Sequence, residues 1–178
     1  VSQQSINQAG FRAGFSCDDH LFVTTMLSET FTEFQSPLWL VAVDFRKAFD
    51  CLNHSCLWSS LVEQGVPTVM ICALQRIYDG QSCRVQSDKL SKAFAVQRGV
   101  RQGDPISPVL FNAALEKMMR SLEERWQRKR WGIKTHCWQR LVDLRFADDL
   151  LLVAGSLHQA RGMLQDLISE AKGYGLEV

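Results

Sequence analysis

The sequence has almost no net charge, no paired cysteine motif and no long apolar run. Its 20 Lys and Arg nearly balance 19 Asp and Glu, which leaves a formal net charge of +1. No strong overall field therefore marks a polyanion partner, and any nucleic-acid surface must be a local patch. No apolar run reaches the roughly 18–20 residues that a membrane span needs, and the N-terminus lacks the basic-then-apolar pattern of a signal peptide. We therefore expect no membrane partner.

Six cysteines are present, but they are scattered and form no C-x-x-C pair. This spacing is typical of free, mostly buried thiols in a reducing intracellular compartment, nuclear or cytoplasmic, rather than of a disulfide frame or a zinc site. The four histidines are too dispersed for a metal cluster. The cysteines are Cys17, Cys51, Cys56, Cys72, Cys83 and Cys137, and the histidines are His20, His54, His136 and His158.

The size and composition of the chain suit one domain. It has 178 residues, of which 46% are hydrophobic and 22% are charged, an ordinary balance for a globular domain with a sizeable core. No repeat, low-complexity tract or linker divides it. The sequence begins at Val1 and its last residues stop in mid-pattern, so we expect a fragment cut from a longer chain.

Apolar periodicity predicts helices and short strands that mix without strict alternation, which favours an α+β sheet with helices packed on one face. Ser16 followed by Asp19 indicates a capping box at the first helix. Either Asp104-Pro105 or Ser107-Pro108 suits the start of a long helix behind the loop 98–108. The other expected elements are helices over about 16–35, 53–64, 67–78 and 157–173, and strands over 38–43, 83–86, 93–97 and 140–156, the last with a turn in its middle.

Acidic residues mark the ends of the apolar runs that we expect to be buried strands. Asp148 and Asp149 lie between two such runs, and Asp44 ends another about a hundred residues earlier. Strand ends that present carboxylates side by side make an oxygen-rich site for hard cations such as Mg²⁺. Two metal ions about 3.5–4 Å apart in such a site can clamp both oxygens of an in-line phosphoryl displacement.

Four segments with these acids among them follow one another in a recognisable order. They are "QAGFRAGFS" (8–16), "DFRKAFD" (44–50), "RGVRQGDPISPVLF" (98–111) and "FADD" (146–149). Together they resemble the successive motifs of reverse transcriptases, most of all those of non-LTR (LINE-type) retrotransposons, with group II intron reverse transcriptases near by. The resemblance implies a polymerase palm, an antiparallel sheet with helices on one face, and an RNA-directed DNA polymerase.

The resemblance also implies a division of the chain. Residues 1–36 would be a remnant of the fingers and residues 37–178 the palm with a helical fingers insert, so that residues 1–178 form one partial reverse transcriptase domain. The thumb would lie outside it. Phe146 stands where relatives often carry Tyr, which keeps the ring and loses the hydroxyl. With these parts missing, we expect the fragment to be inactive by itself.

The resemblance assigns the metal ligands to particular residues. Asp44, Asp148 and the backbone carbonyl of Phe45 would bind two Mg²⁺ ions, for which Mn²⁺ is a possible substitute. Asp149 would support the catalytic site less directly. The alternative for the pair 148–149 is a solvated turn with no catalytic role, beside an unrelated Asp at a strand end.

Further residues would contact the incoming dNTP, if the resemblance holds. Phe49 would lie under the sugar and clash with a 2′-hydroxyl, although a core Phe on a strand-to-helix turn is the alternative. Lys47 and Ala48 would turn backbone N–H groups to the triphosphate. Gln102 would hydrogen-bond the sugar or base, and Gly103 would permit close approach of the backbone.

Basic residues are candidates for phosphate contacts. Arg98 and Arg101 lie in the loop that holds Gln102. Arg12 matches an Arg that contacts the triphosphate in relatives, where a guanidinium binds phosphate bidentately. Ordinary turn residues in the loop, and a surface Arg before a helix, are the alternatives.

The partners implied are an RNA template, a DNA primer and dNTP, and the oligomeric state stays open. Three alternatives remain beside the main interpretation. A group II intron-type reverse transcriptase shares the motifs. A viral RNA-dependent RNA polymerase has a similar palm, but would usually carry a polar residue where Phe49 stands and Gly where Ala147 stands. An inactive, domesticated palm would act as an RNA-binding scaffold, with no need to keep its three acids.

Overall fold

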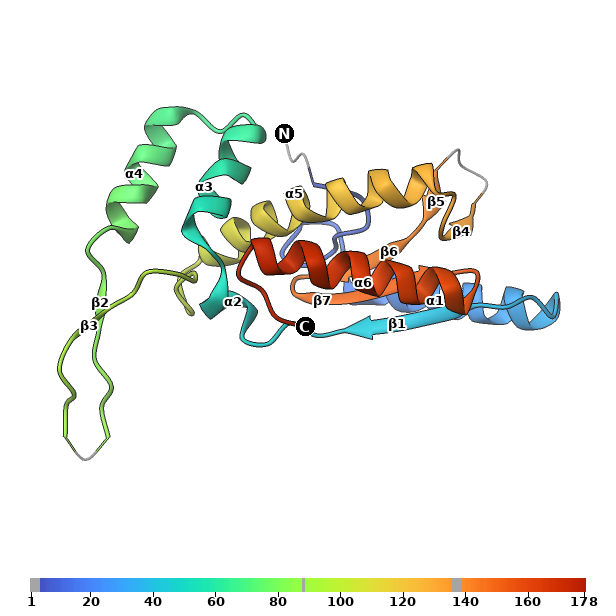
Figure 1. Ribbon diagram of the computed structural model, residues 1–178, viewed down its shortest axis with the longest axis horizontal. Coiled ribbons are helices and arrows are strands. Elements are labelled where there is room, and N and C mark those ends of the chain that lie inside the picture. The colour runs from blue at the N-terminus through green and yellow to red at the C-terminus, as the bar shows by residue number, and fades with distance from the viewer. Residues whose placement is uncertain (1–3, 88, 136–138) are drawn as a thin grey trace.

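The computed structural model describes residues 4–87, 89–135 and 139–178, and places helices on both sides of a small sheet (Figure 1). Cys137 and His136 lie outside these residues. The helices are α1 (Cys17–Glu33), α2 (Ala48–Cys51), α3 (His54–Glu63), α4 (Thr68–Tyr78), α5 (Ser107–Arg128) and α6 (Leu157–Gly173). The strands are β1 (Trp39–Val43), β2 (Ser82–Cys83), β3 (Phe94–Ala95), β4 (Ile133–Lys134), β5 (Arg140–Leu141), β6 (Asp143–Phe146) and β7 (Asp149–Ala154).

The central sheet is antiparallel and has the strand order β1-β7-β6. Strands β6 and β7 form a hairpin, and β1 pairs with β7 along its whole length, from Trp39 opposite Ala154 to Val43 opposite Leu150. Apolar side chains alternate between the two sheet faces, as a period of two requires. The expected antiparallel sheet with an acid-bearing hairpin is confirmed.

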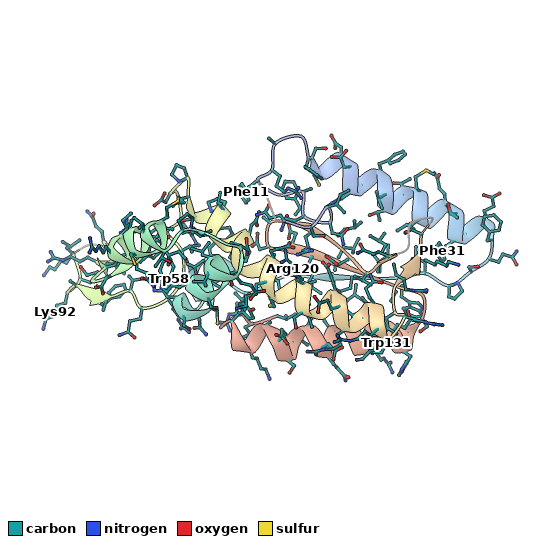
Figure 2. All side chains as sticks on the ribbon, turned by 90° about the horizontal axis from the view of Figure 1, so that it is seen from above. Phe11, Phe31, Trp58, Lys92, Arg120 and Trp131 are labelled. Carbon is teal, nitrogen blue, oxygen red and sulfur yellow. The ribbon has the colours of Figure 1, made fainter. Side chains whose placement is uncertain are left out.

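Helices α5 and α6 cover one face of this sheet and supply a large part of the core. Figure 2 shows them on one side and α1 on the other. From α5, Phe111, Leu115, Met118 and Leu122 are buried, and from α6 Met163 and Leu167. The expected α+β fold with helices on one sheet face therefore holds for the palm, and α1 comes from the N-terminal segment that we assigned to the fingers. No helix in the described part of the chain is both long and apolar enough to cross a membrane.

Local capping signals in the sequence predict where α1 and α5 begin. At α1 the capping box is present, because the Ser16 backbone and side chain exchange hydrogen bonds with Asp19. At α5 the second expected dipeptide, Ser107-Pro108, forms the first two helical residues, one position further into the helix than expected, because the N-cap is Ile106. The carboxylate of Asp104 accepts a hydrogen bond from the Ile106 N–H at 3.1 Å. This turn before the helix takes the place of a side-chain cap. The helix therefore starts one residue earlier than a cap at Ser107 would put it, and two residues later than a cap at Asp104 would.

A helical arm projects from the sheet to one side (Figure 1). It consists of α3, α4 and the hairpin β2–β3, which joins only two residue pairs. The hairpin was expected from residues 83–86 and 93–97, so its strands are shorter than the sequence indicated. The arm continues into the loop 98–106, which leads back to α5 at the sheet.

The five cysteines in the described part of the chain are free, as expected, but none of them is buried. Cys17, Cys72 and Cys83 are exposed, and the other two are half-buried. The expectation of mostly buried thiols is therefore wrong. The position of each cysteine on its element decides its burial more strongly than the average tendency of the residue type.

Candidate active site

The strand register brings the three predicted acids to one end of the sheet. Val43, the last residue of β1, is paired with Leu150, so Asp44, which follows it, comes next to Asp149, the first residue of β7. Asp148 stands in the turn between β6 and β7. Burial raises the pKa of Asp148, its own backbone hydrogen bond lowers it, and the charges of Asp149 and Asp44 raise it further. The three carboxylates therefore interact electrostatically, as packed like charges do.

The donor set at this end of the sheet fits a hard divalent cation. Across residues 4–87, 89–135 and 139–178, no group of three or more His, Cys, Asp or Glu side chains is arranged to hold a metal ion. Two carboxylates and the Phe45 carbonyl would instead supply oxygen ligands. Mg²⁺ commonly takes only one or two carboxylates from protein and completes its shell with water and substrate phosphates. The residues present therefore fit the predicted ion.

The strand-to-helix turn after Asp44 is tightly built. Lys47 adopts a left-handed conformation, with φ of 47°, and α2 begins at Ala48, which is buried. The Phe49 ring stacks on Phe111 from α5, with ring centroids 4.6 Å apart, and the side chain is half-buried. Part of the ring thus belongs to the core and part faces outward. This position is compatible with both predicted roles of Phe49, a core residue and a residue under the sugar.

The loop that holds Gln102 is attached to this turn. The Gly99 N–H donates to the Leu52 carbonyl at 2.7 Å and the Val100 N–H to the Phe49 carbonyl at 2.6 Å. Gln102 Nε2 donates to Asp50 Oδ1 at 3.1 Å. The two distant segments that carry the predicted nucleotide residues are therefore joined by direct hydrogen bonds.

Two separate hollows are each lined by some of the predicted site residues. One has a volume of 1050 Å³ and is lined by Lys47, Gln102 and two arginines, Arg98 and Arg101. It is the kind of local positive patch that a nearly neutral chain needs to bind phosphate. The acids Asp44 and Asp149 line another hollow, of 380 Å³, between α1 and the sheet face opposite α5 and α6. Gly103, in open space with φ of 86°, adopts a backbone conformation that favours glycine.

Arg12 lies away from both of these hollows. Its guanidinium donates to the backbone carbonyls of Ser5 and Gln8, and it stacks 4.0 Å from the centre of the Phe15 ring. It borders a separate hollow, beside α5 and the loop before α4. In this conformation the side chain holds the N-terminal loop together, and its contact with a triphosphate stays a prediction.

Sequence reasoning missed two polar residues near the acids. Gln8 and Asn112 are each 2% exposed, and both contact the backbone beside the hairpin turn. Gln8 lies in the first recognised segment, but nothing in the local pattern of either residue indicates a partner more than a hundred residues away. The only signal in the sequence is an uncharged polar residue at a position that should be buried. Such a residue indicates that a hydrogen bond is present, but not which group is the partner.

Comparison with known proteins identifies the family. The family described as "Reverse transcriptase (RNA-dependent DNA polymerase)" matches residues 2–178. The chain belongs to the reverse transcriptase family. Among curated relatives of this reverse transcriptase domain is the "Retrovirus-related Pol polyprotein from type-2 retrotransposable element R2DM" of Drosophila melanogaster, 32% identical over 149 residues. The match covers 83% of this chain and 13% of that protein.

A second relative is the Pol polyprotein from the type-1 retrotransposable element R2 of Popillia japonica. It is 32% identical over 149 residues, which cover 79% of this chain and 20% of the relative. The reverse transcriptase domain described here therefore spans about a fifth or less of the length of these relatives. The expected likeness to reverse transcriptases of non-LTR retrotransposons is confirmed.

Solved structures show the same fold. Apo telomerase from Candida tropicalis truncated from the C-terminal domain matches with a TM-score of 0.65 and 17% identity, over 95% of this chain and 34% of that chain. Telomerase from the same organism in complex with the TWJ fragment of telomeric RNA matches with a TM-score of 0.67 and 14% identity, over 96% and 29%. At these identities the likeness supports the palm-and-fingers fold alone.

Proposed function

We propose that this domain is the polymerising centre of a retrotransposon protein and extends a DNA primer on an RNA template. The primer 3′-hydroxyl oxygen attacks the α-phosphate of a dNTP, the bond to the β-phosphate breaks, and pyrophosphate leaves. The observation that carries the proposal is the convergence of Asp44 with Asp148 and Asp149 at one end of an antiparallel sheet. Membership of the reverse transcriptase family supports the same reaction.

Within the proposal, the acids hold the cations that the reaction requires. Asp44, Asp148 and the Phe45 carbonyl would bind two Mg²⁺ ions, or Mn²⁺ in their place, and ions bound there stabilise negative charge on the attacking and leaving oxygens. Asp149 adds negative charge beside the ligands and begins β7, which fixes the turn. The pair of carboxylates at the strand ends sets where the primer terminus and the α-phosphate can lie together.

The positive hollow is the proposed site for the triphosphate. Lys47, Arg98 and Arg101 would neutralise phosphate oxygens there, and Gln102 would leave Asp50 to bond the sugar or base. Phe49 would exclude a 2′-hydroxyl with the outward part of its ring. Backbone N–H groups at Lys47 and Ala48, and close approach at Gly103, complete the assignment. To contact the triphosphate, the Arg12 guanidinium would need to release the backbone carbonyls of Ser5 and Gln8.

The cellular setting of the reaction is also part of the proposal. The R2 relatives are polyproteins of retrotransposable elements, and by analogy the template would be an RNA copy of an element and the product would enter a genome. Free thiols on the surface suit a reducing compartment, nuclear or cytoplasmic.

Primer extension on an RNA template by the full-length protein that contains this domain tests the proposed function. We expect Asp148→Asn to lower the extension rate by at least about 100-fold, since such a change removes charge stabilisation at the reacting phosphate. Asp18→Asn is the matched control, because Asp18 belongs to a similar Asp pair in the first turn of α1. It should extend the primer like the wild type.

Two results would contradict the proposal. Equal extension by the wild type and Asp148→Asn would remove the metal-ligand assignment. A wild-type chain that binds RNA but extends no primer, with either Mg²⁺ or Mn²⁺, would favour the RNA-binding scaffold instead.

A further inference from the structure

The N-terminal segment 7–10 extends the sheet beside the acid-bearing hairpin. The Arg145 N–H donates to the Asn7 carbonyl at 2.7 Å, and the Ala9 N–H donates to the Arg145 carbonyl at 2.9 Å. Gln8 is therefore bridged to Arg145 in a parallel sense. This pairing places the Gln8 side chain next to the turn that follows β6, although 139 residues separate Gln8 from Ala147.

The Gln8 amide bonds both polar groups of one turn residue. Its Oε1 accepts hydrogen bonds from the Ala147 N–H at 2.9 Å and the Gly10 N–H at 2.8 Å. Its Nε2 donates to the Ala147 carbonyl at 3.2 Å. The side chain is 2% exposed, so water does not compete for these bonds, and their loss would leave buried backbone groups unpaired.

Ala147 is a residue whose conformation needs support. Its φ is 58°, in the left-handed region that a side chain with a Cβ disfavours. The next residue is Asp148. The rotation of the backbone at Ala147 therefore sets the direction in which the Asp148 carboxylate leaves the turn.

Asn112 from α5 contacts the same N-terminal segment that bonds the turn. Its Nδ2 donates to the Gly10 carbonyl at 2.9 Å, and its Oδ1 lies 3.5 Å from Gln8 Nε2. Gly10 itself lies against the turn, since a Cβ built there would be 2.2 Å from Ala147 N. The peptide 8–10, the helix and the turn therefore form one buried polar unit.

We propose that Gln8 is a positioning residue that holds the Ala147 backbone in its left-handed conformation and so aims the Asp148 carboxylate. Gln8 contacts neither substrate nor cation in this role, which rests on the proposed polymerase function. The amide is needed in both directions, because one atom accepts from the Ala147 N–H while the other donates to the Ala147 carbonyl.

A control comes from a second glutamine, Gln159 on α6, which bonds the backbone at the opposite end of β7. Gln159 Oε1 accepts hydrogen bonds from the Gly155 N–H and the Gly132 N–H, both at 3.2 Å. Gly155 follows the end of β7, whereas Asp149 begins it. Gln159→Met thus removes two amide–backbone hydrogen bonds, against three in Gln8→Met, without touching the turn that bears Asp148.

The test compares Gln8→Met with Gln159→Met in the full-length chain. The first measurement is steady-state primer extension on an RNA template. Groups that orient a metal-binding side chain without contacting the metal contribute roughly 10–100-fold to activity. We therefore expect Gln8→Met to lower kcat by that factor, with little change in the KM for dNTP. Gln159→Met should stay within about twofold of the wild type.

The second measurement is amide hydrogen exchange in the peptide that contains Ala147 and Asp148, and it does not depend on activity. We expect exchange there to be at least about tenfold faster in Gln8→Met than in the wild type or Gln159→Met, because the bond from the Ala147 N–H is lost. Unchanged exchange in Gln8→Met would overturn the proposal even if the wild type showed no extension at all. Faster exchange with an unchanged kcat would also overturn it.

These outcomes separate the two claims. A wild-type chain without polymerase activity contradicts the proposed function, while the exchange result still decides whether Gln8 holds the turn. An active wild type whose kcat falls equally in Gln8→Met and Gln159→Met would show that lost stability alone explains the effect, and the positioning role would be wrong.

Discussion

Arg145 Nη1 lies 3.2 Å from Glu116 Oε2 in the interior, between the sheet and α5. The same guanidinium also contacts Glu123 and lies 2.7 Å from Asp143, so three carboxylates surround one cation. Burial raises the pKa of Glu123 to about 8, with a further rise from the charge of Asp143, and both outweigh the lowering by Arg145. The cluster is therefore stabilised when Glu123 holds a proton.

This arrangement predicts a pH dependence of stability. The folded pKa of Glu123, about 8, exceeds its ordinary value of 4.5, so folding takes up a proton between these values. The contribution of this group is fully present below about pH 4.5 and is lost as the pH rises through about 8, with a slope of at most about 1.4 kcal/mol per pH unit. Glu123→Gln, which imitates the protonated acid, should flatten that slope.

Denaturant unfolding at a series of pH values checks this prediction. Glu124→Gln is the matched control, because Glu124 is the exposed neighbour on the same helix, and it should leave the slope as in the wild type. If the wild type and Glu123→Gln lose stability in parallel from pH 5 to pH 8, then Glu123 is ionised in the folded protein and the prediction is wrong.

The half-buried ring of Phe49 predicts two effects of one substitution. Phe49→Ala should reduce the preference for dNTP over rNTP, because the ring no longer excludes a 2′-hydroxyl. It should also lower the free energy of unfolding by about 2–4 kcal/mol through the lost stacking on Phe111. The ratio of kcat/KM for dNTP to that for rNTP, together with unfolding curves, measures both.

Phe111→Leu separates packing from nucleotide selection, since it disturbs the same stack and leaves the Phe49 ring in place. We expect lower stability and an unchanged ratio of kcat/KM in this variant. If both variants change the ratio to the same degree, or if neither does, Phe49 does not act as the gate.

Close packing at Gly10 predicts that even one methyl group will disturb the catalytic turn. In Gly10→Ala the added Cβ would lie 2.2 Å from Ala147 N and 2.9 Å from Ala147 Cα, both backbone atoms. We expect a loss of stability of about 1–3 kcal/mol and a fall in primer extension of at least about tenfold, because the turn must shift.

The control for Gly10→Ala is Gly173→Ala at the end of α6, where nothing lies within 4 Å of an added Cβ. It should keep full activity and leave stability unchanged or raise it by about 0.5–1 kcal/mol. Full activity in Gly10→Ala, measured in the same extension assay, would mean that the turn tolerates displacement.

Local patterns were enough to predict elements whose signals are local. The helix expected over 157–173 has those bounds, because its apolar spacing and Ser156 cap agree. The hairpin with Asp148 in its turn was also predicted, because two apolar runs flank it. The start of α5 was predicted to within one residue by Ser107-Pro108. The sequence could not decide between this dipeptide and Asp104-Pro105, because the bond from Asp104 to the backbone before the helix depends on the loop and not on the dipeptide.

The tertiary contacts of the site left little trace in the sequence. Asp143 and Arg145 interrupt an apolar strand on one face, and Glu116 and Glu123 lie seven residues apart on one helix, so a buried charge cluster was open to prediction in principle. The hydrogen bonds of Gln8 to Ala147 could not be predicted in this way. A side-chain amide can bond the backbone of any residue, so the sequence contains no complementary residue type that would identify the partner.

Cation binding by the acids at the sheet end can be measured directly. Titration of Mn²⁺ into the full-length chain in the presence of dNTP, followed by electron paramagnetic resonance, counts the tightly bound ions. We predict that Asp44→Asn and Asp148→Asn each abolish tight binding, and that the double variant loses no more than either alone, because both acids share one site. Tight binding that survives in Asp44→Asn while it is lost in Asp148→Asn would contradict the shared site.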